Sequence, residues 1–262
     1  MLFIHVNKND MVFYKDKLVV KHYLTRQEMG WSAAQDAACR IEELLRDREY
    51  INIIFAAAPS QNDFLAALQE CKIDWGRINA FHMDEYIGLP MDAPQRFGNY
   101  LKDHIFGKVP FRQVYYLGDA SVPQEECMRY ASLLEKFPPH IVFLGIGENG
   151  HIAFNDPHVA DFADPFLVKV VDLDLTCRRQ QVNDGCFPSL SEVPTHAYTL
   201  TVPALLASSY LFCIVPSRLK AQAVYHTLYG EIDEACPASI LRTKENAILY
   251  LDKDSAALLN LK

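Results

Sequence analysis

A histidine enclosed by glycine, asparagine and aspartate is the residue of this sequence best suited to proton transfer. The segment 145–157 reads GIGENGHIAFNDP, with the histidine at position 151. An imidazole changes its protonation state near neutral pH, so His151 can act as both acid and base. Asn149 and Asp156 are near enough in sequence to hold its ring in one tautomer. The pattern predicts that His151 is catalytic and that Asn149 and Asp156 orient it.

The same segment has the spacing of a dinucleotide-binding fingerprint, Gly145-x-Gly147-x-x-Gly150. That fingerprint requires a helix to open at its end. Here an Asn-Asp-Pro triplet follows at 155–157, and no amphipathic helical pattern develops. We therefore expect no NAD site. We expect instead that the glycine backbone, including Gly147, passes very close to a ligand.

Two adjacent acids follow the apolar run Ile78–His82 as Met83-Asp84-Glu85-Tyr86. Successive side chains of an extended chain point in different directions, so Asp84 and Glu85 cannot face one substrate atom in the same way. One of them could be a general base while the other pairs elsewhere. A solvated turn is the alternative interpretation of these two residues.

Three further segments could bind an anion. Ser60 and Asp63 fit a helix-capping box after the apolar run Ile51–Ala56, and a helix N-terminus offers free N–H groups to a phosphate. A plain helix cap is the simpler interpretation of that segment. Cations occur as Arg178-Arg179 and as Lys220 after Tyr210–Val215. Lysine or arginine at the carboxyl end of a strand suits phosphate, although solvated charge is the alternative at each position.

Short apolar runs alternate with amphipathic stretches along the chain, which predicts a doubly wound, mostly parallel sheet with helices on both faces, a Rossmann-like α/β fold. We expect residues 1–262 to form a single domain. The predicted strands are Ile51–Ala56, Ile78–His82, Val114–Leu117, Ile141–Gly145, Tyr198–Val202, Tyr210–Val215 and Ala247–Leu251. The predicted helices are Ser32–Arg48, Ser60–Cys71, Gln124–Lys136 and Arg218–Tyr229. In such sheets ligands bind outside the carboxyl ends of the strands.

Composition excludes several functional classes. The net charge is −8 and no basic stripe occurs, which argues against nucleic acid as a partner. No apolar run is long enough to span a bilayer, and the start MLFIHVNKNDM lacks the features of a signal peptide. Seven scattered cysteines without a CxxC motif indicate reduced thiols and a cytoplasmic protein. Neither a zinc-site pattern nor a GxSxG motif is present, so we expect no metal and no serine nucleophile.

Taken together, the segments resemble the glucosamine-6-phosphate deaminase/isomerase family, which shares its fold with 6-phosphogluconolactonases. The matching segments keep the family's order from about residue 51 to residue 251. They are FHMDEYIGLP (81–90), FLGIGENGHIAFNDP (143–157), VPTHAYTLTVPALL (193–206), SRLKAQAV (217–224) and CPASILR (236–242).

The resemblance implies a mechanism for a small phosphorylated sugar. Asp84 is then the base that moves a proton between C2 and C1, and His151 assists ring opening. No metal or organic cofactor is required. The resemblance implies phosphate contacts from the loop that contains Ser60, from an arginine and from Lys220. The residues expected to bind substrate or phosphate are Ala58, Ser60, Gln61, Glu85, Gly147, Arg178, Arg179 and Lys220.

The sequence departs from the family pattern at three places. The family's Gly-Gly phosphate loop is here Ala57-Ala58-Pro59-Ser60, so the phosphate contacts are weaker or are rearranged through Ser60 and Gln61. Asp156 stands where the family usually has glutamate, one methylene longer. The family's phosphate arginine aligns with neither Arg178 nor Arg179 cleanly, and the choice between them stays open.

The leading prediction is conversion of glucosamine-6-phosphate to fructose-6-phosphate and ammonia, by aldose–ketose isomerisation with deamination. A lactonase that hydrolyses a phosphorylated sugar acid is the second reading, and it would use His151 as the base for water without needing Asp84. A sugar-phosphate sensor without turnover is the third. The C4 stereochemistry of the amino sugar stays open. Homo-oligomers are common among such enzymes, but no segment of the sequence identifies a subunit interface.

Overall fold

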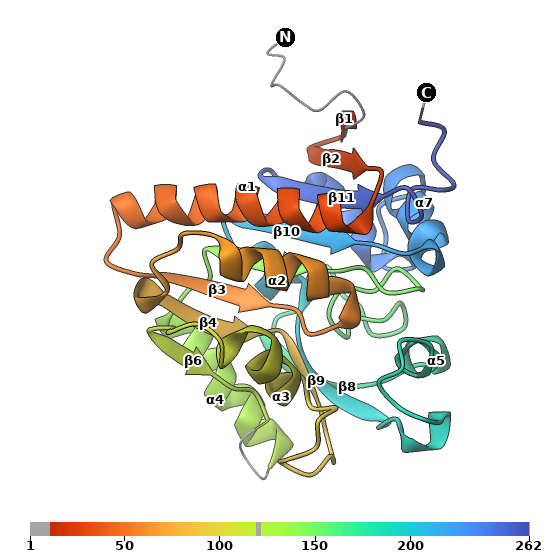
Figure 1. Cartoon of the computed structure of the whole chain (residues 1–262). Helices are drawn as coiled ribbons and strands as arrows, with labels where there is room; N and C mark the ends of the chain where they lie inside the picture. The colour runs from red at the N-terminus through yellow and green to blue at the C-terminus, as the bar shows by residue number, and fades with distance from the viewer. Residues whose placement is uncertain (1–10, 119–121, 262) are drawn as a thin grey trace.

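An eight-stranded sheet forms the centre of the protein in a computed structural model that describes residues 11–118 and 122–261 (Figure 1). The strand order is β1-β2-β11-β10-β7-β3-β4-β6, and neighbours are parallel except in the edge hairpin β1–β2. Its strands are β1 (Met11–Lys15), β2 (Leu18–Tyr23), β3 (Ile51–Phe55), β4 (Ile78–His82), β6 (Gln113–Tyr115), β7 (Ile141–Leu144), β10 (Tyr210–Val215) and β11 (Ala247–Asp252).

Helices cover both faces of this sheet, because its central strands are apolar on both sides. Ile53 and Phe55 of β3 belong to the core shared with α1 and α2, whereas Ile54 belongs to the core on the opposite face, which includes residues of α4, α6 and α7. The doubly wound fold predicted from the sequence is therefore confirmed. The helices are α1 (Arg26–Arg46), α2 (Asn62–Glu70), α3 (Phe97–Leu101), α4 (Pro123–Lys136), α5 (Leu175–Asn183), α6 (Val202–Leu206) and α7 (Ala221–Tyr229).

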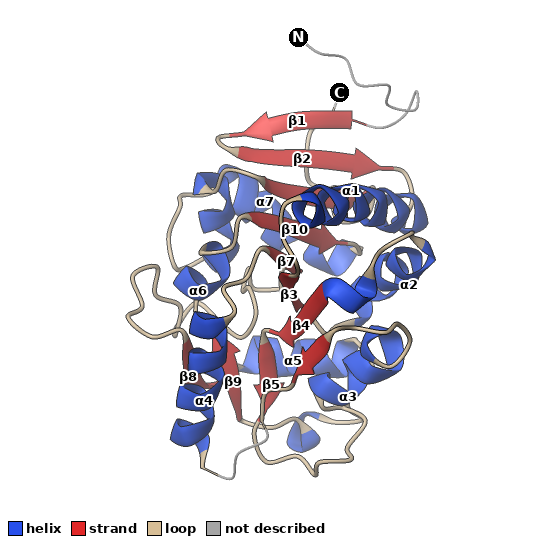
Figure 2. Ribbon diagram, turned by 90° about the vertical axis from the view of Figure 1, so that its left-hand side faces the viewer, coloured by secondary structure: helices blue, strands red, loops and turns tan. Residues whose placement is uncertain are grey.

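A second, antiparallel sheet of three strands lies beside the first, with α4 along it (Figure 2). It consists of β5 (Asp84–Tyr86), β9 (His196–Leu200) and β8 (Val168–Asp172), with β9 in the middle. The sequence predicted Tyr198–Val202 as a strand but did not separate it from the parallel sheet. That strand ends at Leu200, because Thr201 caps α6 and Pro203 follows in its first turn.

The strand order reverses between β3 and β7. From β3 the chain continues outward through β4 and β6, and from β7 it continues the other way through β10 and β11. A crevice at the carboxyl ends of the strands forms at such a switch point. In Figure 1 the arrowheads of β3 and β10 point toward the side of the molecule where α5 lies.

Several local predictions were wrong in detail. The sequence predicted neither the β1–β2 hairpin nor α5, and α1 begins at Arg26 rather than Ser32, after a capping box on Thr25. The capping box predicted at Ser60 is absent, since Ser60 lies within the 3₁₀ turn Pro59–Gln61 and Asp63 pairs with Arg26. The signal-peptide prediction concerns a start whose first ten residues lie outside the described part.

All seven cysteines are free thiols, as the sequence predicted. In the part of the chain that the structure describes, none of the helices combines the length and the hydropathy needed to cross a bilayer.

Candidate active site

A hollow at the switch point encloses about 480 Å³, part of it open to solvent. Four strand ends and helix α5 contribute polar side chains to it: the loops after β3 and β7, the residues after β4 and β10, and α5. Polar and ionisable side chains reach it from every one of these elements. They are Ser60, Gln61, Asp84, His151, Gln180, Gln181 and Lys220, and the backbones of Ala58, Gly145 and Gly147 complete the wall.

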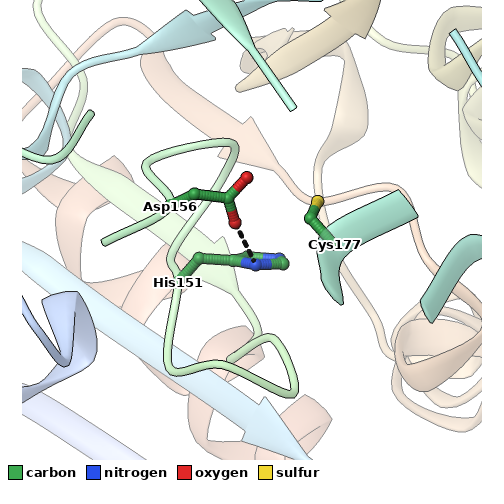
Figure 3. Close-up of side chains that lie close together, drawn as sticks. All are labelled: His151, Asp156 and Cys177. Atoms are coloured by element: carbon green, nitrogen blue, oxygen red, sulfur yellow. Dashed lines mark ion pairs between the residues drawn. The ribbon is translucent and has the colours of Figure 1, made fainter. Parts of the chain in front are cut away.

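The imidazole of His151 is held on one side by two oxygens. Its Nδ1 lies 2.7 Å from Oδ1 of Asn149 and 2.9 Å from Oδ1 of Asp156 (Figure 3). Both atoms are acceptors when Asp156 is ionised, so Nδ1 carries the proton and Nε2 is left for the pocket. The shorter side chain of Asp156 therefore does reach the ring. The structure brings these three residues together as the sequence predicted, and their catalytic role stays a prediction.

The acid beside His151 is held in its ionised form. Burial alone would raise the pKa of Asp156, but hydrogen bonds from His151 and Asn149, with the electrostatic effect of His151, lower that pKa below its ordinary value. The amide of Asn149 also donates to Asp174 at 3.1 Å, so Asn149 bridges the loop to the start of α5. The ring is thus fixed by a buried polar network rather than by one contact.

Gly147 is required for a steric reason. A Cβ built on Gly147 would lie 2.2 Å from Cε1 of His151, closer than any real contact. The backbone of the same glycine also donates to the carbonyl of His151 at 2.9 Å. The close approach at Gly147 was expected for a ligand, and in the structure the imidazole of His151 is the group that approaches this glycine.

Asp84 and Glu85 face opposite ways, as expected for neighbours on strand β5. Asp84 lines the hollow, whereas Glu85 is fully buried behind it and accepts from the amides of Phe97 and Gly98, each at 3.0 Å. Arg96 lies 3.6 Å from Glu85. The substrate contact predicted for Glu85 is thus not supported, because its carboxylate holds the start of α3.

The surroundings of Asp84 raise the proton affinity of its carboxylate. Burial, and secondarily the charge of Glu85, raises the pKa of Asp84 well above its ordinary value. Its Oδ1 is buried and has no hydrogen-bond partner among the described residues. A buried acceptor without a partner in the protein indicates an oxygen that a substrate satisfies.

His82 fixes the backbone of Asp84. Its Nδ1 lies 2.9 Å from the carbonyl oxygen of Asp84, and its Nε2 accepts from the amide of Leu117 at 2.9 Å. Burial lowers the pKa of His82 to about 4, so the ring is neutral with its proton on Nδ1. His82 positions the acid and does not itself line the hollow.

Lys220 supplies the positive charge of the hollow. Its side chain is 5% exposed and forms no ion pair with any acid that the structure describes. Burial lowers the pKa of Lys220, while the charges of Asp184 and Glu148 oppose that shift. A buried ammonium with no partner in the protein is costly, and an anionic ligand would offset that cost.

The loop after β3 supplies neutral groups. Nε2 of Gln61 donates to the carbonyl of Ile214 at 3.1 Å and to Oγ of Ser60 at 3.2 Å, while its Oε1 is buried without a partner among the described residues. The carbonyl of Ala58 accepts from the amide of Gln61. Ser60 and Gln61 are therefore hydrogen-bonded to each other in this loop, and the rearrangement of phosphate contacts through them stays a prediction.

The arginines predicted to bind phosphate do not reach the hollow. Nη2 of Arg178 donates at 2.8 Å to the carbonyls of Leu190 and Val193, and Arg179 is exposed. Sequence reasoning chose the arginines of this segment and missed the next two residues, Gln180 and Gln181, which line the hollow. The polar helix α5 lacks the apolar stripe of a packing helix, and that signal could have directed attention to them.

Three groups lie close enough to share a metal ion: His151, Asp156 and Cys177, with ligand atoms within 4.8 Å of one another (Figure 3). Burial raises the pKa of Cys177 well above its ordinary value, so its thiol stays protonated and is a poor ligand. Nδ1 of His151 is already engaged by two oxygens. The donor chemistry gives this cluster the character of an acid–base network.

The comparisons with known proteins agree with this geometry. The family model described as glucosamine-6-phosphate isomerases/6-phosphogluconolactonase matches residues 24–250. The glucosamine-6-phosphate deaminase of Bacillus cereus strain G9842 is 32% identical over 242 residues, which cover 92% of this chain and 88% of the relative. That of strain B4264 is 32% identical over 219 residues, covering 83% and 82%.

Solved structures share the fold. A monomeric glucosamine-6-phosphate deaminase has a TM-score of 0.82 at 28% identity, over 91% of this chain and 99% of that one. A 6-phosphogluconolactonase from Thermotoga maritima has a TM-score of 0.73 at 23% identity, over 90% and 100% of the two chains. On the family match and the curated relatives, this chain belongs to the family of glucosamine-6-phosphate isomerases and 6-phosphogluconolactonases.

Proposed function

We propose that the protein is an enzyme that converts glucosamine-6-phosphate to fructose-6-phosphate and ammonia. The observation that carries the proposal is the buried Oδ1 of Asp84, which has no hydrogen-bond partner among the described residues and lies in the same hollow as His151 and Lys220. Isomerisation needs a base beside a carbon acid, and lactone hydrolysis does not. The relatives named glucosamine-6-phosphate deaminase support the same choice.

Binding would begin with the phosphate. Lys220 provides the charge, and the hydroxyl of Ser60 provides a hydrogen bond from the neighbouring loop. The sugar then extends toward His151 and Asp84. Opening of the pyranose ring moves the proton of the C1 hydroxyl to the ring oxygen, and Nε2 of His151 is the group with the geometry to carry it.

Asp84 then acts on the open chain. Its carboxylate removes the proton from C2, the electron pair forms the C1–C2 double bond, and the π electrons of the C1 carbonyl move onto O1. O1 takes a proton from the ammonium group on C2, which gives an enolamine, and the carboxyl of Asp84 then returns its proton to C1 as the nitrogen lone pair forms the C2–N double bond. The resulting imine at C2 takes up water and releases ammonia, leaving the ketose phosphate. A carboxylate with a raised pKa is a stronger base than an ordinary one, which suits the removal of a proton from carbon.

A lactonase is the alternative, since 6-phosphogluconolactonases share the fold. There His151 would activate water, and Asp84 would not take part in the proton transfer. Asp84→Asn separates the two functions, because it keeps the size of the side chain and removes the base. Isomerisation should fall by a factor of about 10³ or more, whereas hydrolysis should survive within a few-fold.

The deciding experiment incubates the pure protein with glucosamine-6-phosphate and measures ammonia and fructose-6-phosphate together. We expect equal amounts of both, and loss of both in Asp84→Asn. Galactosamine-6-phosphate, assayed in parallel, reports the C4 preference. Turnover of 6-phosphogluconolactone by wild type and variant alike would replace the proposal with the lactonase. Folded protein that binds glucosamine-6-phosphate without turning over any of these compounds would favour a sensor.

We further propose that residues 1–262 act as one catalytic domain in the cytoplasm. Asp84 in the hollow belongs to the three-stranded sheet, and Lys220 follows strand β10 of the eight-stranded sheet. Both sheets therefore contribute to the site. Seven free thiols suit a reducing compartment. Light scattering of the purified protein would decide between a monomer and a homo-oligomer.

A further inference from the structure

Helix α5 places two glutamines at the hollow, and among the described residues only the side chain of Gln180 makes hydrogen bonds within the protein. Oε1 of Gln180 accepts from the amide of Glu148 at 2.9 Å, and its Nε2 lies 3.3 Å from Asp184. The side chain of Gln181 is 7% exposed, lines the hollow and makes no hydrogen bond to any residue that the structure describes. A carboxamide with two donors and an acceptor is therefore directed at a ligand.

Helix α5 runs from the cluster of His151, Asp156 and Cys177 past Gln181 to Asp184. Cys177, early in the helix, belongs to the cluster with His151 and Asp156. Gln181 lies one helical turn further along on the same face. Asp184, just beyond it, is close enough to act on the pKa of Lys220. Gln181 and Lys220 therefore line the same hollow, and α5 lies within electrostatic reach of the cation.

The charge in this part of the hollow is low. Lys220 and His151 are the basic residues among those described as lining it, and His151 belongs to the reaction centre. Arg178 is bound to the carbonyls of Leu190 and Val193. An anion next to Lys220 is accordingly held by one cation together with neutral hydrogen-bond donors.

Resting on the proposed function, we propose that Gln181 is a specificity-determining residue whose carboxamide, together with Lys220 and Ser60, binds the phosphate that the sugar carries on C6. Gln180 serves as its support, because it ties α5 to the amide of Glu148. Recognition of the phosphate then depends on hydrogen-bond geometry as much as on charge. An arginine at this position would convert the same contact into a bidentate ion pair.

The test compares Gln181→Leu with wild type on glucosamine-6-phosphate and on glucosamine without phosphate. We expect the KM for the phosphorylated sugar to rise roughly 10- to 100-fold with kcat within about threefold, as for loss of a hydrogen bond to a charged group. The kcat/KM for glucosamine should stay within about threefold of wild type, since that sugar has no phosphate to contact. Gln222→Leu, the same change at an exposed position of α7, is the matched control.

Two results would overturn the assignment. Equal losses on both sugars would mean that Gln181 only supports the shape of the site. If the KM for glucosamine-6-phosphate were normal in Gln181→Leu but raised in Arg179→Leu, the phosphate contact would be assigned to Arg179 instead. Gln181→Arg adds a positive readout, because it should lower the KM for the phosphorylated sugar and make that KM more sensitive to salt.

The phosphate contact of Gln181 can be tested even if the protein proves not to be a deaminase. If wild type turns over neither sugar, the thermal shift produced by glucosamine-6-phosphate is measured instead. A shift in wild type that is lost in Gln181→Leu and kept in Gln222→Leu would support the phosphate contact in a protein without deaminase activity. A shift that persists unchanged in Gln181→Leu would exclude the contact.

Discussion

Thr199 lies directly opposite Asp84 in the ladder between β5 and β9, and its Oγ1 accepts from the amide of Phe154 at 3.0 Å. One residue of the small sheet therefore contacts both the strand that carries the base and the loop that carries His151. Nδ2 of Asn155 strengthens the connection by donating to the carbonyl of Leu200 at 2.8 Å. The separation of Asp84 and His151 is therefore set in part by β9 and not by the parallel sheet alone.

Thr199→Val tests this connection. The substitution keeps the shape of the side chain but leaves the buried amide of Phe154 without an acceptor, which costs about 1–3 kcal/mol of unfolding free energy. Misplacement of His151 relative to Asp84 should also lower kcat roughly tenfold or more. Urea denaturation and steady-state kinetics measure both effects. Thr195→Val, at an exposed position just before β9, should change neither, and equal effects in the two variants would argue against the connection.

Gly147→Ala should inactivate the enzyme while leaving it folded. The added methyl group would lie within 2.4 Å of three atoms of the His151 ring, so the imidazole must leave its position between Asn149 and Asp156. We expect kcat to fall by about 10² or more, with a circular dichroism spectrum like that of wild type. The control is Gly76→Ala, where a methyl group meets only a side-chain oxygen at 3.6 Å. Full activity in Gly147→Ala would mean that this ring position is not needed.

Asp84→Asn should stabilise the protein at neutral pH although it removes the base. The pKa of Asp84 is raised in the folded state above its ordinary value of 3.8, so the folded protein holds a proton that the unfolded chain releases. The stability from Asp84 is complete below about pH 4 and is lost as the pH rises through its folded-state pKa. Asparagine resembles the protonated acid, so the variant does not lose this stability as the pH rises.

The measurement is Tm against pH for wild type and Asp84→Asn. At pH 7 the variant should melt at least about 2 °C higher, and the two curves should converge near pH 4. Asp254→Asn, at an exposed position, should follow wild type throughout. Curves that stay parallel at every pH would show that Asp84 titrates normally in the folded protein. The same titration predicts that kcat/KM falls as the pH drops below the raised pKa of Asp84.

Lys220→Met should stabilise the folded protein and weaken the binding of substrate. Methionine fills a similar volume without a buried charge, so the Tm of the free enzyme should rise. The KM for glucosamine-6-phosphate should increase roughly 10- to 100-fold, because the cation at the phosphate is lost. Calorimetry and kinetics measure the two changes. Arg218→Met, an exposed neighbour outside the hollow, is the control, and an unchanged KM in Lys220→Met would contradict the proposed phosphate contact.

The parallel sheet, and the meeting of Asp84, His151 and Lys220 in one hollow, could be predicted from the sequence because the signals for them are local. Apolar runs such as Tyr210–Val215 predict buried strands by themselves, and the glycines that precede His151 indicate a close backbone approach before any contact is known. The order of strand and helix then places the loops at one edge of the sheet. Asp84, His151 and Lys220 meet there because parallel strands end at the same side.

Tertiary structure alone decided which neighbours of these residues face the hollow. Asp84 and Glu85 are both acids in one motif, and only the pairing of β5 with β9 turns the first inward and the second toward Phe97. On α5, the arginines carry the charge that chemistry favours, yet the helix presents Gln181 instead. Which face a residue takes depends on contacts far away in the sequence. Local composition therefore determined the kind of chemistry, and packing determined which side chains can perform it.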